Sequence, residues 1–153
     1  MKLIPSYSNL QRTYSMTEKN IIVALDDPLD YQSVLEVLDP KKCLLKVGSV
    51  IFNYHGRKIL DEVSGHGFEI FFDIKFHDIP NTVSKSIESF KSYSIKLLTI
   101  HLSGGRSMIK SALDSCKNIN AKCIGVPLRA LAKLTIQRMD NDSCLLAATS
   151  RGT

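Results

Sequence analysis

The sequence has no apolar run that approaches the roughly 20 residues of a membrane-spanning helix. None of its four cysteines forms a Cys-x-x-Cys pair, and no histidine stands at zinc-finger spacing from them. The net charge is +5, but lysine and arginine are scattered along the 153 residues, and no nucleic-acid-binding motif accompanies them. These absences exclude a membrane span and a zinc module, and they disfavour nucleic acid as a partner. A mild positive excess suits an anionic small molecule instead.

Residues 1–20 are polar and contain no apolar stretch like that of a secretory signal peptide. Cys43 and Cys123 fall within apolar segments, where a free cysteine behaves as a small hydrophobic residue. We therefore predict a reduced, cytoplasmic protein. Residues 1–20 are interpreted as a polar extension that precedes the first strand.

Five short runs of β-branched and other apolar residues recur about 22 to 28 residues apart, which is the length of one strand with one crossover helix. Strands are expected at residues 21–25, 43–47, 69–74, 97–102 and 123–126. Apolar residues at helical spacing predict helices at 29–38, 50–63, 106–117 and after Pro80, which suits the first position of a helix. Strands that alternate with helices predict a parallel sheet of the α/β class.

Two α/β architectures compete for this pattern. An open doubly wound sheet often has a glycine-rich turn after its first strand, but here Asp26-Asp27-Pro28 follows that strand. A (β/α)8 barrel instead gathers its active site at the C-terminal ends of the strands. Side chains alternate along a strand, and this alternation places polar residues on one face near the ends of four strands: Asp26, Lys46, Asp73 with Lys75, and Thr99 with His101. The pattern therefore favours the barrel.

The densest group of charges is Asp73-x-Lys75-x-x-Asp78, and Lys46 lies one strand earlier. One interpretation is an ordinary ion-pair network at the end of a sheet, since structural networks also shift pKa values. The other is an active site, because buried charges are costly unless they pair, and proteins seldom bury them for stability alone. The residues by themselves leave both interpretations open.

The whole segment from Asp73 to Val83, Asp-Ile-Lys-Phe-His-Asp-Ile-Pro-Asn-Thr-Val, resembles the signature of the orotidine 5′-phosphate decarboxylase family. Flanking segments agree with the same family, namely Ala24-Leu25-Asp26, Lys46-Val47-Gly48 and His101-Leu102-Ser103-Gly104-Gly105. The resemblance covers roughly residues 21–126. It implies a (β/α)8 TIM-barrel fold, here a truncated barrel of about five strand–helix units in residues 21–127.

The resemblance also implies cofactor-free decarboxylation of orotidine 5′-phosphate to UMP, a step of pyrimidine biosynthesis, with no bound metal. Lys75 would be the proton donor to C6 of the pyrimidine, and Asp73 would lie against the substrate carboxylate. Lys46 and Asp78 would complete an alternating array of charges with them. Together with Asp26, Lys46 would also bind the ribose hydroxyls.

Substrate contacts are implied along the whole signature. The residues expected to bind substrate are Asp26, Lys46, Asp73, Ile74, Lys75, Phe76, His77, Asp78, Ile79, Pro80, Asn81 and Thr82. In the family, the residues that match Asp78 and Thr82 reach into the site of a neighbouring subunit, so a homodimer with shared sites is expected. We interpret His77 as a loop residue and His101 as a hydrogen-bonded structural histidine.

The resemblance stops after Val126. Pro127-Leu128-Arg129 stands where the family has a Thr-Ser pair that contacts the pyrimidine, and residues 128–153 are interpreted as a divergent tail. The tail contains neither the glutamine loop nor the Gly-x-Arg segment with which the family binds phosphate, and a full barrel needs about 200 residues or more. We therefore expect a truncated chain that does not decarboxylate the substrate at a useful rate by itself.

Two other interpretations are kept. A metal-dependent 3-keto-gulonate-phosphate decarboxylase or hexulose-phosphate synthase would share Asp-x-Lys-x-x-Asp, although the stretch from Phe76 to Thr82 argues against it. A magnesium requirement would separate these enzymes from the leading interpretation. A non-enzymatic fragment is the third interpretation, and activity together with cooperative unfolding would test it.

Overall fold

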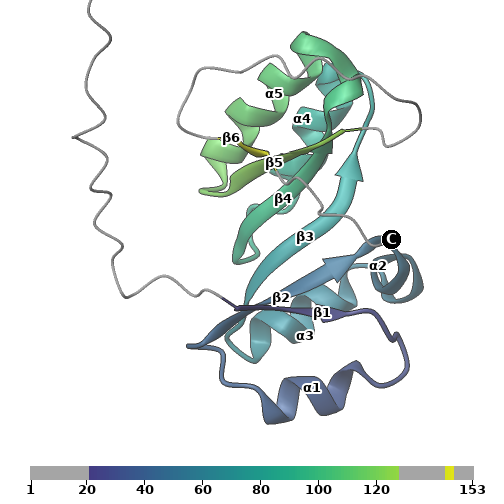
Figure 1. Cartoon of the computed structure of the whole chain (residues 1–153), viewed down its shortest axis with the longest axis vertical. Helices are drawn as coiled ribbons and strands as arrows, with labels where there is room; N and C mark the ends of the chain where they lie inside the picture. Colours follow the sequence, from purple (N-terminus) through teal and green to yellow (C-terminus); the bar gives the residue numbers. More distant parts are fainter. Residues whose placement is uncertain (1–20, 128–143, 147–153) are drawn as a thin grey trace, which may run out of the picture.

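The computed structural model describes residues 21–127 and 144–146, in which parallel strands alternate with helices (Figure 1). In these residues, six strands form one sheet: β1 (Ile21–Leu25), β2 (Cys43–Gly48), β3 (Glu69–Phe76), β4 (Ile95–His101), β5 (Lys122–Val126) and β6 (Cys144–Leu146). The helices are α1 (Tyr31–Val37), α2 (Ser49–His55), α3 (Lys58–Gly65), α4 (Pro80–Glu88) and α5 (Gly105–Asn118), with a 3-10 turn, η2 (Leu102–Gly104), before α5.

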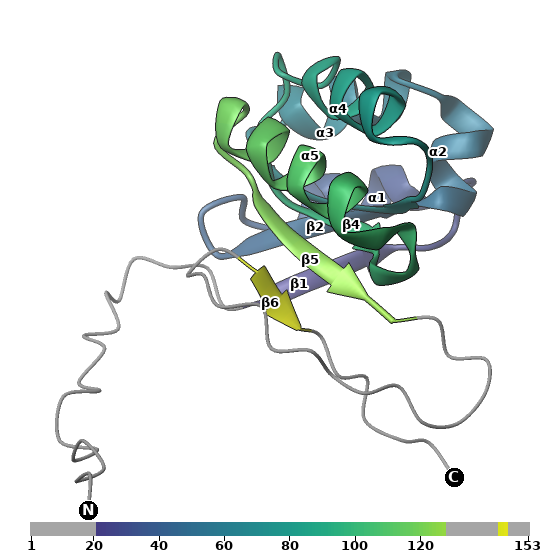
Figure 2. The ribbon, with the colours of Figure 1, turned by 90° about the horizontal axis from the view of Figure 1, so that it is seen from above.

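The strands lie in the sheet in their order along the chain, from β1 to β6, and each pairs in parallel with the next. The helices lie together on one side of the sheet (Figure 2). A doubly wound sheet would reverse its strand order at a switch point and would carry helices on both faces. Neither feature occurs over 21–127 and 144–146, so the architecture is that of a partial barrel.

The five predicted strands are all present, and their ends differ from the prediction by at most two residues. The helix predicted at 50–63 is instead two helices, α2 and α3, which separate at Gly56. Gly56 has φ 63° and ψ −141°, a backbone conformation that is open to glycine and costly for other residues. β6 is an addition to the predicted elements, and it pairs with β5 so that Cys144 stands opposite Cys123.

The hydrophobic core lies between the sheet and the helices. Phe72 of β3 is fully buried, while its neighbours Phe71 and Asp73 face the other side of the sheet and are partly exposed. Phe72 packs edge-on against Phe52 of α2 and against Phe90, with ring centroids 5.0 and 4.8 Å away. This packing determines which residues of β3 turn to the face that carries the charged side chains.

Gly56 and Gly65 form a matched pair for testing the break between α2 and α3. An added Cβ would meet no heavy atom within 4 Å at either position, so backbone conformation alone separates them. Gly56→Ala is expected to lower the free energy of unfolding by about 1–3 kcal/mol, because Gly56 has a positive φ. Gly65→Ala, in α3 and without a positive φ, is expected to raise it by roughly 0.5–1 kcal/mol. Urea unfolding measures both, and shifts of equal size and sign would contradict the structure at Gly56.

Candidate active site

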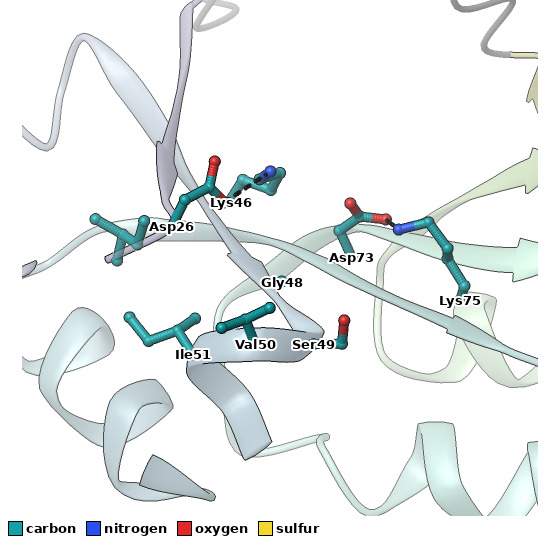
Figure 3. A pocket seen from close by; sticks show the side chains of 9 residues that line it. Asp26, Lys46, Gly48, Ser49, Val50, Ile51, Asp73 and Lys75 are labelled. Atoms are coloured by element: carbon teal, nitrogen blue, oxygen red, sulfur yellow. Dashed lines mark hydrogen bonds and ion pairs between the residues drawn. The ribbon is translucent and has the colours of Figure 1, made fainter. Parts of the chain in front are cut away.

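Four charged side chains line one open pocket of about 190 Å³ at the C-terminal ends of the first three strands (Figure 3). Lys46 comes from β2, Asp73 and Lys75 come from β3, and Asp26 directly follows β1. Neighbouring parallel strands end at the same edge of a sheet, so residues far apart in sequence meet there. The other lining residues are Leu25, Gly48, Ser49, Val50 and Ile51.

The four charged side chains form two ion pairs beside the pocket (Figure 3). Lys46 Nζ lies 3.1 Å from Asp26 Oδ1, and Lys75 Nζ lies 2.9 Å from Asp73 Oδ1. These pairs stay in contact with solvent, since the side chains of Asp26 and Lys75 are 73% and 42% exposed. Exposed pairs contribute only about 0–1 kcal/mol to stability. These two ion pairs therefore contribute little to the stability of the fold.

The strand β3 departs from regular geometry at Lys75. Its pairing with β4 runs from Phe72 opposite Leu98 to Phe76 opposite Ile100, which is four residue steps on β3 against two on β4. Lys75 adopts φ 55°, in the left-handed region that costs a residue with a Cβ roughly 1–2 kcal/mol. Strained backbone of this kind concentrates at functional sites, where the surrounding contacts maintain it.

The hydroxyl group of Thr99 in β4 contacts both parts of this bend. Lys75 donates its backbone N–H to Thr99 Oγ1 at 2.9 Å, and Thr99 donates its hydroxyl to Asp73 Oδ1 at 3.0 Å. Thr99 is buried. Strand alternation places Thr99 on the pocket face of β4, but the sequence prediction of the site omits it. The available signal was a hydroxyl-bearing residue in the middle of a mostly buried strand.

Two residues of the signature turn away from the pocket. Ile74 and Phe76 pack against the hydrophobic core, because they alternate with Asp73 and Lys75 along β3. Neither residue lines the pocket, and the substrate contacts predicted for Ile74 and Phe76 stay predictions. Their role in the structure is to hold the strand that carries the charged pair.

The segment after β3 forms an exposed loop that leads to α4, which begins at Pro80 as predicted. Asp78 Oδ1 accepts the backbone N–H of Ile79 at 2.6 Å. The exposed residues of this segment are His77, Asp78, Ile79, Asn81 and Thr82. None of these five residues, nor Pro80, lines the pocket of Figure 3. Asp78 is thus the member of the predicted charged array that lies outside the pocket of its own chain.

His101 ends β4 and lies beside His77, with ring centroids 5.1 Å apart. Its Nδ1 atom is buried and has no hydrogen-bond partner in the described part of the chain, so the predicted hydrogen bond is missing at this atom. Burial lowers the pKa of His101 below the ordinary value of a histidine, and the positive charges of His77 and Lys75 lower it further. The neutral form of His101 is therefore favoured.

Positive charge in the pocket comes from lysine side chains, Lys46 and Lys75. Across the described ranges, no group of three or more histidine, cysteine, aspartate or glutamate side chains could hold a metal ion. The cysteines described there, Cys43, Cys116 and Cys123, are buried and free. In the same ranges no helix combines the length and the apolar character that crossing a membrane requires.

A family model described as orotidine 5′-phosphate decarboxylase / HUMPS matches residues 19–144, which is most of the chain. The chain belongs to this family. The resemblance inferred from the signature is thereby confirmed. The family match also continues past Val126, where the recognisable sequence motifs end.

Curated members of the decarboxylase family are similar to the chain over about half of their own length. The orotidine 5′-phosphate decarboxylase of Laribacter hongkongensis is 35% identical over 121 residues, which are 78% of this chain and 50% of that protein. The enzyme of the same name from Chromohalobacter salexigens is 37% identical over 123 residues, 79% of this chain and 51% of the relative. The one from Ehrlichia canis is 44% identical over 110 residues, 70% of this chain and 48% of the relative.

Solved structures of the decarboxylase family share the fold of the described strands and helices. The orotidine 5′-phosphate decarboxylase of Lactobacillus acidophilus aligns with a TM-score of 0.63 and 33% identity, over 77% of this chain and 55% of that chain. The Methanocaldococcus jannaschii orotidine 5′-monophosphate decarboxylase, in complex with the inhibitor BMP, aligns with a TM-score of 0.60 and 26% identity, over 69% of this chain and 50% of that chain. The predicted partial TIM barrel is confirmed.

The environment of His101 predicts how it titrates. Its pKa is expected below the ordinary value of 6.5, which NMR titration of the ring protons measures directly. His77→Gln removes a repelling positive charge and should raise the pKa of His101, whereas His66→Gln, at an exposed position after α3, should leave it unchanged. Because the folded state disfavours the protonated ring, His101 contributes stability above pH 6.5 that is lost as the pH falls below it. A pKa above 6.5 would contradict the described burial.

Proposed function

We propose that this site decarboxylates orotidine 5′-phosphate to UMP. The observation that carries the proposal is the Lys75–Asp73 ion pair at the pocket, beside the Lys46–Asp26 pair on the neighbouring strands. The chain spans about half the length of its curated relatives, so the activity is proposed for a protein in which further strands complete the barrel. Like the family reaction, the proposed one uses no cofactor.

Lys75 is the proposed proton donor. When CO₂ leaves C6 of the pyrimidine, the electron pair of the broken C–C bond stays on C6 and must be protonated. The ammonium group of Lys75 lies 2.9 Å from Asp73 Oδ1 at the pocket, and this position supports the proposed role. The proton forms the new C6–H bond, and the neutral amine of Lys75 remains. A cation fixed where negative charge develops also stabilises the transition state.

Asp73 is proposed to lie against the carboxylate that leaves. Its Oδ1 accepts hydrogen bonds from Lys75 and Thr99, so the protein fixes its position before substrate binds. The negative charge of Asp73 repels the carboxylate of the substrate, whereas it does not repel the neutral CO₂ that forms. The charge of Asp73 therefore destabilises the bound substrate relative to the product. The same carboxylate orients the Lys75 ammonium group.

Lys46 and Asp26 are proposed to bind the ribose. The ammonium group of Lys46 can only donate hydrogen bonds, and the carboxylate of Asp26 can only accept them. Vicinal hydroxyl groups do both, so they are matched by this pair, whose atoms lie 3.1 Å apart. Exposure of Asp26 at the pocket leaves its oxygens available for such contacts.

A homodimer with shared sites is proposed as the working form. Asp78 and Thr82 are exposed and lie outside the pocket of their own chain, which supports a role in the pocket of a partner. Between them, Ile79 is 65% exposed, and Val50 at the pocket rim is exposed to the same extent. Apolar side chains at these positions suit a subunit contact. The free, buried cysteines support the further proposal of a reducing, cytoplasmic location.

The second candidate is a metal-dependent decarboxylase or synthase of a sugar phosphate. The matching family model bears the description of both groups, whereas the named curated relatives are orotidine 5′-phosphate decarboxylases. Lys46 and Lys75 at the pocket favour a reaction in which lysine supplies the positive charge. Magnesium dependence of the activity distinguishes the two candidates.

The test uses a fused barrel, in which residues 1–126 are joined to the C-terminal half of the Lactobacillus acidophilus decarboxylase. We expect it to consume orotidine 5′-phosphate, followed by the loss of substrate absorbance. Lys75→Ala should lower kcat by roughly 10⁴-fold or more, because it removes both the proton donor and the cation. Lys110→Ala, at an exposed position of α5, should leave kcat unchanged.

Three outcomes would contradict the proposed function. The first is a fused barrel that melts cooperatively and shows no turnover. The second is a Lys75→Ala variant that keeps about a tenth of the rate, since a proton donor is worth far more than that. The third is activity that is lost with EDTA and restored by Mg²⁺, which would favour the sugar-phosphate enzymes. Residues 1–153 assayed alone are expected to show no turnover, and turnover there would show that this chain is sufficient.

A further inference from the structure

Two polar side chains are buried among the described residues, Thr99 and Ser115, and each is 2% exposed. Ser115 of α5 joins two helices, because its Oγ lies 2.8 Å from Ser84 Oγ and 3.4 Å from Glu88 Oε1, both in α4. Thr99 lies in the sheet and bonds to Asp73 and Lys75 of the candidate active site. Since burying a hydroxyl group is costly without such bonds, the site itself explains why Thr99 is tolerated there.

The direction of both hydrogen bonds of Thr99 follows from the chemistry of its partners. The carboxylate of Asp73 can only accept, so the hydroxyl proton of Thr99 points to Oδ1. The backbone N–H of Lys75 can only donate, so it takes a lone pair of Oγ1. One hydroxyl group therefore joins the side chain of Asp73 to the main chain of Lys75.

This contact replaces a missing part of the ladder between β3 and β4. The regular pairing stops at Phe72 and resumes at Phe76, and Lys75 lies in the interval with φ 55°. The N–H of Lys75 is satisfied by Thr99 Oγ1 within that interval. This hydrogen bond is partly buried, and an N–H that is shielded from water without a partner is costly. Loss of the hydroxyl group would therefore act first on the left-handed bend, and through it on the direction of the Lys75 side chain.

We propose that Thr99 is a positioning residue, whose hydroxyl group holds the left-handed bend at Lys75 and the Asp73 carboxylate in one arrangement. In this arrangement Lys75 Nζ and Thr99 Oγ1 both approach Asp73 Oδ1, at 2.9 and 3.0 Å. The placement of the ammonium group depends on a residue that does not line the pocket. The consequence for catalysis rests on the proposed function, whereas the consequence for the backbone does not.

Hydrogen exchange at the Lys75 amide tests the backbone consequence without any need for activity. It is measured on the full chain and on the fused barrel, by NMR. Thr99→Val keeps the shape of the side chain and removes the hydroxyl group, so Lys75 amide exchange should accelerate about tenfold or more. Thr99→Ser keeps the hydroxyl group and should stay within about threefold of the parent. Ser115→Ala is the matched control, because it removes the other buried hydroxyl group and should leave Lys75 unchanged.

An unchanged Lys75 exchange rate in a Thr99→Val variant that melts cooperatively would overturn the proposal. If the Thr99→Val variant does not fold, a measurement on the unsubstituted protein tests the role of Thr99 instead. A nuclear Overhauser effect between the Lys75 amide proton and the side-chain protons of Thr99 is then expected, because Lys75 N lies 2.9 Å from Thr99 Oγ1. Its absence would overturn the proposal as well.

Turnover of the fused barrel tests the catalytic consequence. Thr99→Val should lower kcat by roughly ten- to a hundredfold with a KM change below about threefold, because ground-state binding groups remain while the proton donor is misplaced. Thr99→Ser should restore most of kcat. Equal loss in Thr99→Val and Thr99→Ser would contradict a role of the hydroxyl group. A fused barrel without any turnover would refute the proposed function, and the exchange rates would still decide the role of Thr99.

Discussion

The carboxylate of Asp73 is the contact on which the arrangement of the pocket depends. One oxygen, Oδ1, accepts hydrogen bonds from both the ammonium group of Lys75 and the hydroxyl group of Thr99. Thr99 in turn accepts the backbone N–H of Lys75, so three residues on two strands close a ring of hydrogen bonds. Within this ring the backbone conformation of Lys75 and the position of its side chain are coupled. The reacting group of the proposed mechanism is thus oriented by the sheet rather than by a loop.

Buried apolar side chains of β3 offset the backbone strain at Lys75. A left-handed lysine costs roughly 1–2 kcal/mol, whereas full burial of one large apolar side chain stabilises the protein by about 1.5–3 kcal/mol. Ile70 and Phe72 precede the bend on the same strand and are fully buried, and β3 pairs with strands on both sides. The strand is therefore anchored before the bend by buried side chains and by its regular pairing with β2. The larger of the two irregularities in its pairing with β4 lies near its C-terminal end, beside the charged side chains.

The sequence predicted the fold well because the apolar runs repeat at the length of a strand–helix unit, and the alternation within each run identifies the pocket face. It placed Asp26, Lys46, Asp73 and Lys75 at one edge of the sheet, where the structure has them. The bend at Lys75 could not be predicted, since lysine has no preference for a positive φ and tertiary contacts impose it. Alternation placed Thr99 on the same face, but its contacts with Asp73 and Lys75 could not be predicted, because a threonine is ordinary in a strand and makes these contacts only through that bend.

The described strands themselves hold Lys75 in a left-handed conformation, with its ammonium group 2.9 Å from Asp73 Oδ1. The intraresidue nuclear Overhauser effect between the amide and Hα protons tests it, because a positive φ brings these two protons close together and an extended strand separates them. Asn120, with φ 57° in the turn after α5, is an internal reference for the positive φ, and Phe72 is a reference for the extended strand. We expect the Lys75 cross-peak to be as strong as that of Asn120. A Lys75 cross-peak as weak as that of Phe72 would contradict the account.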